Sequence, residues 1–426
     1  MFSRIEALRF RALHHVSIEL SPFHVLVGPN ASGKSTFLDV IGFLGDLLRA
    51  GPAAAVGGDP RLGITSRASD PAHLCWMRKG GTFELAVELE IPEERRPTGN
   101  GKQTHARYEV AIDVGNDTEP LRIATETLWL MPTPEPPATM TVQPAFPSMR
   151  EAPTTLLEPK TKKHRIGWKK IVSKIGESGN DYFSAETSGW SAPFRLGPTR
   201  SALANLPEDE AKFPAAIWVK GLLTERIQRV VLDAQAMRLP SPPAAPRTFM
   251  PDGSNLPWVV EALRRESPDQ LAKWLAHVQT ALPDLKGVET VEREEDRHRY
   301  LMVEYQNGLR APAWLVSDGT LRLLALTLLA YAPTVGVVLV EEPENGIHPR
   351  AIETVYESLR SVYDAQVLCA SHSPVVLGLA RPSEVLCFAK DSSGATDIVR
   401  GTEHPRLRDW KSGADLGTLF AAGVLG

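Results

Sequence analysis

The chain has 426 residues, of which 42% are hydrophobic and 23% charged, and its formal net charge is −4. This length and composition predict a folded protein with two or three cores, or with one large α/β core that carries an insertion. The slightly acidic balance excludes a positive charge spread over the whole protein, so any surface that binds nucleic acid must be a local patch.

The first 50 residues predict strands, a glycine-rich loop and a helix. Alternating apolar residues indicate short strands within residues 5–20, residues 24–27 indicate a buried strand, and apolar residues at helical spacing indicate a helix over residues 36–48. Between the last two lies GPNASGKST, residues 28–36, which fits the phosphate-binding pattern G-x-x-x-x-G-K-[ST] without a mismatch. Because this pattern stands between a strand and a helix, as its chemistry requires, it predicts a nucleotide-binding site.

The middle of the chain predicts a second sheet and then helices. Residues 82–130 contain three segments of strand pattern, with a turn expected at Asn116-Asp117, and they indicate an antiparallel sheet. Residues 131–159 are rich in proline and poor in apolar residues, which favours an extended linker or surface loop. Residues 200–285 look helical, with a fresh helical run after Ser267-Pro268, and RYLMVEYQNG predicts a further strand and turn.

The last third of the chain places acids and a histidine after two predicted strands. Residues 335–343 read VGVVLVEEP, a buried strand that ends in Glu341 and Glu342. Beside the phosphate loop, Glu341 would hold the Mg²⁺ shell and Glu342 would polarise an attacking water. Burial explains the valines, but not two adjacent acids, which would be costly to desolvate unpaired. His372 follows the strand of residues 366–370 and is a candidate contact to the γ-phosphate.

A further helix is predicted directly after residues 316–320, which read VSDGT. Ser317 or Asp318 is a natural N-cap for it. A helix N-terminus with a small hydroxyl is an anion site, but Ser-Asp-Gly before a helix is also ordinary capping chemistry. Both interpretations stay open on these residues alone.

Together these motifs resemble the ATP-binding-cassette (ABC) ATPases, within them the RecF/SMC-like branch that includes prokaryotic AAA family proteins related to the overcoming-lysogenisation-defect ATPases. The resemblance lies in the opening RIEALRFRALHHVSIELSPFHVLVGPNASGKST and in LVSDGTLRLLALTLLAY, VLVEEPENGIHP and ASHSP. It implies an α/β P-loop NTPase head with a mixed central sheet, an antiparallel β subdomain and a mostly helical insertion. The implied organisation is residues 1–130 and 311–426 as the two parts of the ATPase core, with residues 131–310 inserted.

The resemblance also implies roles for individual residues, with ATP and Mg²⁺ as the cofactors. Lys34 would grip the β- and γ-phosphates, Ser35 and Glu341 would bind Mg²⁺, Glu342 would be the general base, and His372 would sense the γ-phosphate. The nucleotide would lie on the loop residues Gly28, Pro29, Asn30, Ala31, Ser32, Gly33, Lys34, Ser35 and Thr36.

The implied assembly is a head-to-tail homodimer, or a higher oligomer, that forms on ATP. Ser317 and Gly319 would reach the ATP of a second subunit, and Asn345, Gly346 and His348 would lie at the dimer seam.

Three departures from the family pattern stand out. The signature sequence LSGGQ appears as VSDGT, and Glu341 stands where many relatives have aspartate. No glutamine occurs between Phe37 and Lys102, so the residue that usually couples Mg²⁺ binding to lobe movement has no obvious counterpart there.

An ATPase of this kind would act as a switch, and the insertion is expected to carry the part that acts on its target. The insertion is too short for the long arms of SMC proteins. Residues 160–174 are basic with no acid and include Trp168, a pattern that suits nucleic acid, an acidic partner protein, or merely a solvated loop. Residues 249–257 predict either a polar turn before a helix or a contact that shapes the nucleotide pocket.

These features favour an ATP-hydrolysing switch in a bacterial defence or genome-maintenance system, acting on nucleic acid or with a separate effector such as a nuclease. The alternative is an ATP-dependent scaffold or sensor that controls a separate toxin or nuclease, while the departures above disfavour a transporter ATPase. Three widely spaced cysteines and the absence of a secretory signal or a long apolar segment favour a cytoplasmic protein without membrane contact.

Overall fold

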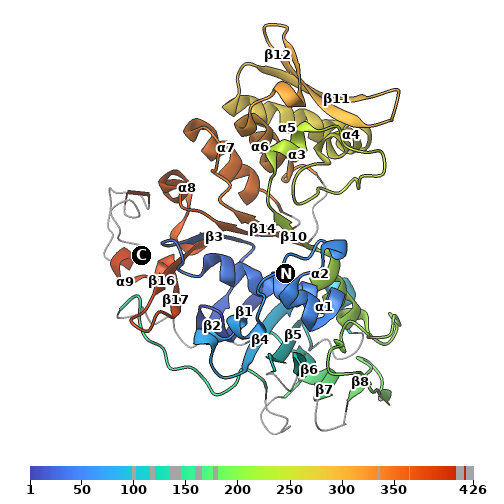
Figure 1. Cartoon of the computed structure of the whole chain (residues 1–426), viewed down its shortest axis with the longest axis vertical. Coiled ribbons are helices and arrows are strands. Elements are labelled where there is room, and N and C mark those ends of the chain that lie inside the picture. The colour runs from blue at the N-terminus through green and yellow to red at the C-terminus, as the bar shows by residue number, and fades with distance from the viewer. Residues whose placement is uncertain are drawn as a thin grey trace.

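The computed structural model of the chain describes residues 1–97, 102–115, 120–134, 145–158, 166–175, 181–332, 336–363, 365–408 and 417–418. The strands of this described part form sheets of eight, six and three strands. In Figure 1 the eight-stranded sheet and helix α1 lie below the six-stranded sheet, whereas the three-stranded sheet and helices α3–α7 lie above it. The six-stranded sheet therefore joins two lobes.

The six-stranded central sheet has the order β10-β14-β15-β3-β16-β17. Its strands are β3 (Phe23–Val27), β10 (Ile227–Val230), β14 (Val337–Glu341), β15 (Gln366–Ala370), β16 (Val385–Lys390) and β17 (Thr396–Arg400). Neighbours pair in parallel except β16 and β17, which are antiparallel, so the predicted mixed sheet is confirmed. Because parallel strands end at one edge, the residues that follow β3, β14 and β15 gather there.

Strand β3 shows how the central sheet serves two cores. Leu26 packs into the cluster of the lower lobe, whereas Val25 and Val27 pack into that of the upper lobe. Successive side chains of a strand point to opposite faces, so one apolar strand supplies both clusters.

The eight-stranded sheet is antiparallel throughout and has the order β2-β1-β4-β5-β6-β7-β8-β9. Its strands are β1 (Phe2–Phe10), β2 (Leu13–Glu19), β4 (Thr82–Glu90), β5 (His105–Asp113), β6 (Arg122–Met131), β7 (Lys169–Ile175), β8 (Tyr182–Ser184) and β9 (Ser191–Pro193). Strands β4–β6 confirm the antiparallel sheet predicted for residues 82–130. The turn expected at Asn116-Asp117 lies outside the described residues.

Helix α1 (Lys34–Gly57) packs between the two large sheets. The ring of Phe43 lies 5.5 Å from that of Phe83 in β4, and the ring of Phe37 lies 5.6 Å from that of Phe388 in β16. In the described part of the chain α1 is the helix with the length and apolar character to cross a membrane, but its apolar side chains are buried in this core.

The remaining helices lie mostly in the upper lobe, and α2 packs beside α1. They are α2 (Pro214–Glu225), α3 (Ala234–Arg238), α4 (Leu256–Glu266), α5 (Pro268–Ala281), α6 (Asp318–Leu328), α7 (Pro349–Arg360), α8 (Pro374–Leu379) and α9 (Pro405–Arg408). The three-stranded sheet consists of β11 (Leu285–Glu292), β12 (Arg299–Tyr305) and β13 (Arg310–Pro312). Short 3₁₀ helices cover Pro60–Leu62, Pro71–Leu74, Trp76–Arg78, Glu93–Arg95, Ala313–Leu315, Pro382–Glu384 and Gly401–Glu403.

The break predicted at Ser267-Pro268 is confirmed, because α4 ends at Glu266 and α5 begins at Pro268. Proline disfavours the helical conformation of the preceding residue, which ends one helix, and its fixed φ suits the first position of the next.

The segment 131–310 differs from the mostly helical insertion that was expected. Strands β7–β9 continue the eight-stranded sheet, and β10 forms an edge of the central sheet. Strands β11–β13 add a third sheet beside α4 and α5. The described helices therefore account for only part of this segment, and its first and middle parts complete the two large sheets.

The described residues 145–158 form a strap held to the eight-stranded sheet and to β17, rather than a free linker. Leu156 N–H donates to the Glu84 carboxylate at 2.6 Å, and the Leu156 carbonyl accepts from Arg107 at 3.1 Å. At its other end Arg150 forms an ion pair with Asp397 at 2.9 Å. The strap thus supplies hydrogen-bond partners to buried Glu84 and Arg107 and a counter-charge to buried Asp397.

Candidate nucleotide-binding site

The phosphate loop lies between β3 and α1 and rests on the hairpin of β16 and β17. A Cβ on Gly28, whose φ is +148°, would lie 2.1 Å from the Phe388 carbonyl oxygen, and one on Gly33, whose φ is +107°, would lie 2.3 Å from Thr396 Oγ1. Thr396 Oγ1 also donates to the Ser32 carbonyl at 2.8 Å. Only glycine fits these two positions, which explains the loop sequence.

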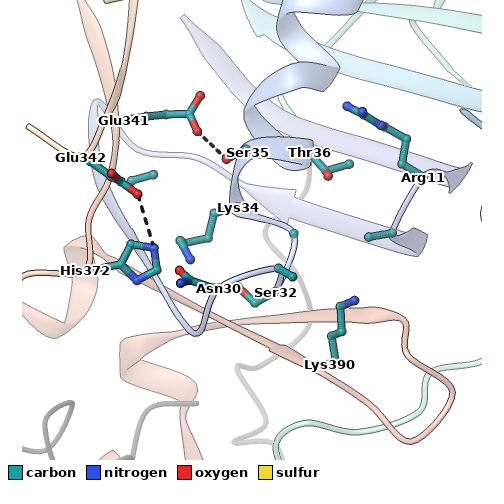
Figure 2. A pocket seen from close by; sticks show the side chains of 14 residues that line it. Arg11, Asn30, Ser32, Lys34, Ser35, Thr36, Glu341, Glu342, His372 and Lys390 are labelled. Carbon is teal, nitrogen blue, oxygen red and sulfur yellow. Dashed lines mark hydrogen bonds and ion pairs between the residues drawn. The ribbon is translucent and has the colours of Figure 1, made fainter. Parts of the chain in front are cut away.

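A cavity of about 480 Å³ opens over this loop. It is lined by Arg11, Ala12, Asn30, Ala31, Ser32, Gly33, Lys34, Ser35, Thr36, Glu341, Glu342, Ala370, His372 and Lys390. Figure 2 shows that the loop side chains face Glu341, Glu342 and His372 across it. The two ends of the chain thus meet at one site, as the motifs predicted.

Lys34 points into the loop and is only 7% exposed. Its ammonium donates to the carbonyls of Gly28 at 2.8 Å and Pro29 at 2.9 Å. Burial lowers the pKa of Lys34 to about 8, against the opposing attraction of Glu342 and Glu341. Gly28 and Pro29 do not line the cavity, and they contact the site only by accepting hydrogen bonds from Lys34 through their carbonyls.

Ser32 supplies a second sign that the loop is built for a ligand. Its side chain is 2% exposed, and within the described residues its hydroxyl has no hydrogen-bond partner although it borders the cavity. An unpaired buried hydroxyl is costly, and a phosphate oxygen in the cavity would satisfy it.

Ser35 and Glu341 provide the oxygens that suit Mg²⁺. The Ser35 hydroxyl donates to Glu341 Oε2, and the other carboxylate oxygen, Oε1, accepts from Arg229 Nη2 at 2.7 Å. Hydroxyl and carboxylate oxygens beside a phosphate loop are the donors that Mg²⁺ prefers, so these residues fit the ion.

Glu342 follows β14 in a left-handed conformation with φ of +51°. Its backbone N–H donates to the Ala370 carbonyl at 2.8 Å, and its carboxylate accepts from the Asn345 side chain. Left-handed backbone is strained for a residue with a side chain, and such strain is often found at functional sites. The conformation turns Glu342 toward the cavity (Figure 2).

His372 lies across the cavity edge, with Nε2 4.0 Å from Glu342 Oε1. Its backbone N–H and the Ser371 hydroxyl both donate to Glu344 Oε1 at 2.8 Å, which fixes the segment after β15. Burial lowers the pKa of His372, and the nearby Lys34 lowers it further. The ring is therefore held neutral more readily than a free histidine.

Ser317 and Gly319 lie outside the residues that line this cavity. Ser317 is the N-cap of α6, as predicted, and its Oγ accepts from Thr320 N–H at 3.2 Å. A Cβ on Gly319 would lie 2.4 Å from the Gly346 carbonyl oxygen, so close packing within its own subunit is enough to explain a glycine at this position. Their expected contact with a second ATP stays a prediction.

Three basic residues of the site were not singled out from the sequence. Arg11 and Lys390 line the cavity, and Arg229 pairs with Glu341. Arg11 lies in the turn between β1 and β2 with φ of +51°, and Lys390 ends β16. Lys390 and Arg229 each lie at or near the end of a strand of the central sheet. Had the order of the strands been known, this position would have indicated that both residues lie near the site.

The basic run 160–174 is only partly described: residues 166–168 lead into β7, which begins at Lys169, and the Trp168 ring lies 5.9 Å from that of Trp129. Lys174 is 1% exposed and donates to the carbonyls of Gly197 and Arg200, so this lysine of the run is not available to a nucleic acid or to a partner protein. Lys169 donates to the Glu186 carbonyl, and Lys170 lies 4.4 Å from the Trp129 ring centroid. Residues 160–165 lie outside the described residues.

None of the described residues that line the nucleotide cavity is a glutamine, so the counterpart of the coupling glutamine stays unassigned. Gln228 of β10 is buried and donates to the Phe249 carbonyl at 2.8 Å. Within residues 249–257 a turn leads into α4, which begins at Leu256, in agreement with the simpler interpretation of a polar turn before a helix. Pro251 and Asp252 accept backbone hydrogen bonds from Val231 and Asp233, and none of the segment lines the nucleotide cavity.

A protein-family model matches more than half of the chain. It covers residues 23–89 and 162–378 and is described as an AAA domain, putative AbiEii toxin, of type IV toxin–antitoxin systems. An 81-residue stretch is also 35% identical to the phosphate import ATP-binding protein PstB 1 of Streptococcus mutans. That stretch is 18% of this chain and 28% of the length of that curated relative.

Two solved structures are similar over nearly the whole chain. An SMC head bound to the C-winged helix domain of ScpA matches with a TM-score of 0.53, covering 93% of this chain and 96% of its own. An SMC head with an extended coiled coil, bound to the C-terminal domain of ScpA and derived from Pyrococcus furiosus, matches with 0.50 over 93% and 95%. At 12% identity both show the fold alone, and they confirm the predicted P-loop NTPase head.

Proposed function

The chain belongs to the AAA domain family described as putative AbiEii toxin of type IV toxin–antitoxin systems, and we propose that it is a switch that closes on ATP and opens on hydrolysis. Within that family it is an ATP-binding, ABC/SMC-like ATPase. The observation that carries the proposal is the meeting of the phosphate loop with Glu341, Glu342 and His372 around one cavity.

The proposed roles follow from position and charge. Lys34 and the loop amides hold the phosphates, and the Ser35 hydroxyl and Glu341 carboxylate hold the ion. Mg²⁺ at these oxygens neutralises charge on the phosphates. Glu342 takes the proton of the attacking water, and His372 contacts the γ-phosphate from the opposite edge.

The proposed closed state is a head-to-tail dimer with two ATP molecules at its interface. Support comes from Ser317, which is exposed at the start of α6 and does not line the nucleotide cavity of its own subunit. A helix N-terminus with a hydroxyl favours an anion, and the γ-phosphate of a second subunit would supply it. Hydrolysis removes that anion and weakens the interface.

A separate protein is the partner that the observations favour. Both SMC heads of this fold carry a ScpA domain in their structures. In the described part of the basic run Lys174 is buried, Lys169 bonds to a backbone carbonyl and Lys170 lies over the Trp129 ring. Nucleic acid remains the competing ligand. ATPase stimulation by DNA or RNA would favour nucleic acid over a protein partner if it is lost on charge reversal of Lys162, Lys163, Lys169 and Lys170.

The test of the proposed function is Glu342→Gln, with the exposed acid Glu353→Gln of α7 as the matched control. Loss of a general base lowers the rate by about 10²–10⁴-fold, so phosphate release falls by that range in Glu342→Gln and not in the control. ATP and Mg²⁺ then trap a dimer in sedimentation velocity. An unchanged rate excludes Glu342 as the base, and a monomer at saturating ATP excludes the dimer.

Complementation gives an independent arm. Lys34→Ala and Ser317→Arg proteins are each inactive in the proposed dimer, but a mixed dimer has one intact site made of Lys34 from one subunit and Ser317 from the other. Recovery of hydrolysis on mixing supports the head-to-tail arrangement, and no recovery contradicts it.

A further inference from the structure

We propose that Arg229 is a positioning residue that holds Glu341 in the orientation required for Mg²⁺. This inference rests on the proposed function, because it assigns a role within the same ATPase site. Neither the loop motif nor the strand-end acids point to it, since Arg229 lies in a different strand and 112 residues before Glu341.

Sheet register brings the two residues together. Strand β10 pairs in parallel with β14, and Arg229 lies opposite Leu339, two residues before Glu341. A long side chain on an edge strand can cross that offset, and Arg229 Nη2 reaches Glu341 Oε1 at 2.7 Å. Ser35 occupies the other oxygen, so both oxygens of this carboxylate have a donor.

The identity of residue 341 explains why such a donor is needed. Glutamate has one more rotatable bond than the aspartate that many relatives have at this position, and each free rotor costs entropy when it is fixed. A guanidinium holds a carboxylate in one plane. Arg229 thus fixes the longer side chain, so that Oε2 stays beside Ser35.

Two opposing effects of Arg229 on Mg²⁺ can be compared. Its positive charge repels the ion, but the Arg229 side chain is 51% exposed, so solvent screens much of that repulsion. Hydrogen-bond partners that orient metal ligands contribute about 10–100-fold in metal affinity or activity. Orientation therefore outweighs repulsion, and loss of Arg229 weakens metal binding.

Arg229 also lies on the connection between the metal site and α6. Beyond β10 the chain enters α3, where Arg238 donates to the Val316 carbonyl at 2.8 Å and forms an ion pair with Asp318. The segment from Arg229 to Arg238 thus contacts Glu341 at one end and the N-terminus of α6 at the other.

The experiment compares wild type with Arg229→Ala, Arg229→Lys and Arg226→Ala, a matched control that removes an exposed arginine three residues earlier. Mn²⁺ binding in the presence of a non-hydrolysable ATP analogue is followed by electron paramagnetic resonance, and kcat is measured at saturating Mg²⁺. Arg229→Ala is expected to weaken Mn²⁺ binding by about tenfold and to lower kcat by a similar factor. Arg229→Lys is expected to keep most of the Mn²⁺ affinity and most of kcat, and Arg226→Ala is expected to change neither quantity.

The same substitutions in a Glu341→Asp background separate positioning from general stability. The shorter aspartate does not reach Arg229, so Arg229→Ala in that background is expected to change Mn²⁺ affinity less than about twofold. Unchanged Mn²⁺ affinity in Arg229→Ala, or an equal loss in both backgrounds, overturns the inference. If wild type itself fails to bind the ATP analogue with Mn²⁺, the proposed function fails instead.

Discussion

The affinity for ATP should fall as the pH rises above 8, because Lys34 loses its proton in the free protein. Burial among the loop carbonyls lowers the pKa of this lysine to about 8, more than two units below its ordinary value of 10.5. The ammonium is the form that pairs with phosphate oxygens. Binding ATP therefore raises the pKa of Lys34, and above pH 8 the complex takes up a proton.

The size of the effect follows from that pKa. At pH 9, one pH unit above the pKa of Lys34, about one-tenth of the free protein carries the ammonium. The dissociation constant for ATP therefore rises about tenfold between pH 7 and pH 9. That factor is about 1.4 kcal/mol of binding free energy.

Isothermal titration calorimetry measures both quantities. Titrations in two buffers of different ionisation enthalpy at pH 8.5 give the number of protons taken up, and a pH series gives the dissociation constant. Lys34→Arg is the control, because a guanidinium does not titrate in this range and its affinity should stay flat. A wild-type dissociation constant that is constant up to pH 9.5 would refute the reasoning.

Two further predictions concern stability. Gly319→Ala places a methyl group 2.4 Å from the Gly346 carbonyl oxygen, so we expect a loss of about 1–3 kcal/mol in the free energy of unfolding, measured by chemical denaturation. Gly221→Ala is the control and should cost nothing, because no atom of the described residues lies within 4 Å of its added methyl group. An equal effect of the two would contradict the close packing of α6. His24 is fully buried, its Nε2 accepts from Ser21 N–H, and burial lowers its pKa to about 4. The unfolded chain then binds more protons, so stability should fall by about 3 kcal/mol from pH 6.5 to pH 4. His24→Gln should show a shallower slope in urea titrations, and parallel slopes would exclude this histidine as the cause.

Features that depend on neighbouring residues could be predicted from the sequence. The strand, loop and helix around residues 24–48, the cap at Ser317 and the break at Pro268 all appear in the structure. Each follows from local sterics or from a hydrogen bond within a few residues, and such interactions do not depend on the rest of the fold.

Strands β7–β9 show where this reasoning stops. The basic run 160–174 suggested a binding surface or a solvated loop, yet its residues from Lys169 on pair with β6 and bury Lys174 against backbone carbonyls. Glu84 and Arg107 likewise each form a hydrogen bond with Leu156 in the strap of residues 145–158. A charged residue in a sequence carries no sign of a partner that is dozens of residues away.

By itself the sequence determined the chemistry of the site: a loop for phosphates, two acids at a strand end and a histidine after another strand. Only the tertiary structure decided which residues complete it, because the pairing of β10 with β14 brings Arg229 to Glu341, and the seating of α6 on the turn after β14 requires Gly319 beside Gly346. The physical reason is that periodicity tells which face of a strand is buried, whereas strand order and register are set by non-local packing of the whole sheet.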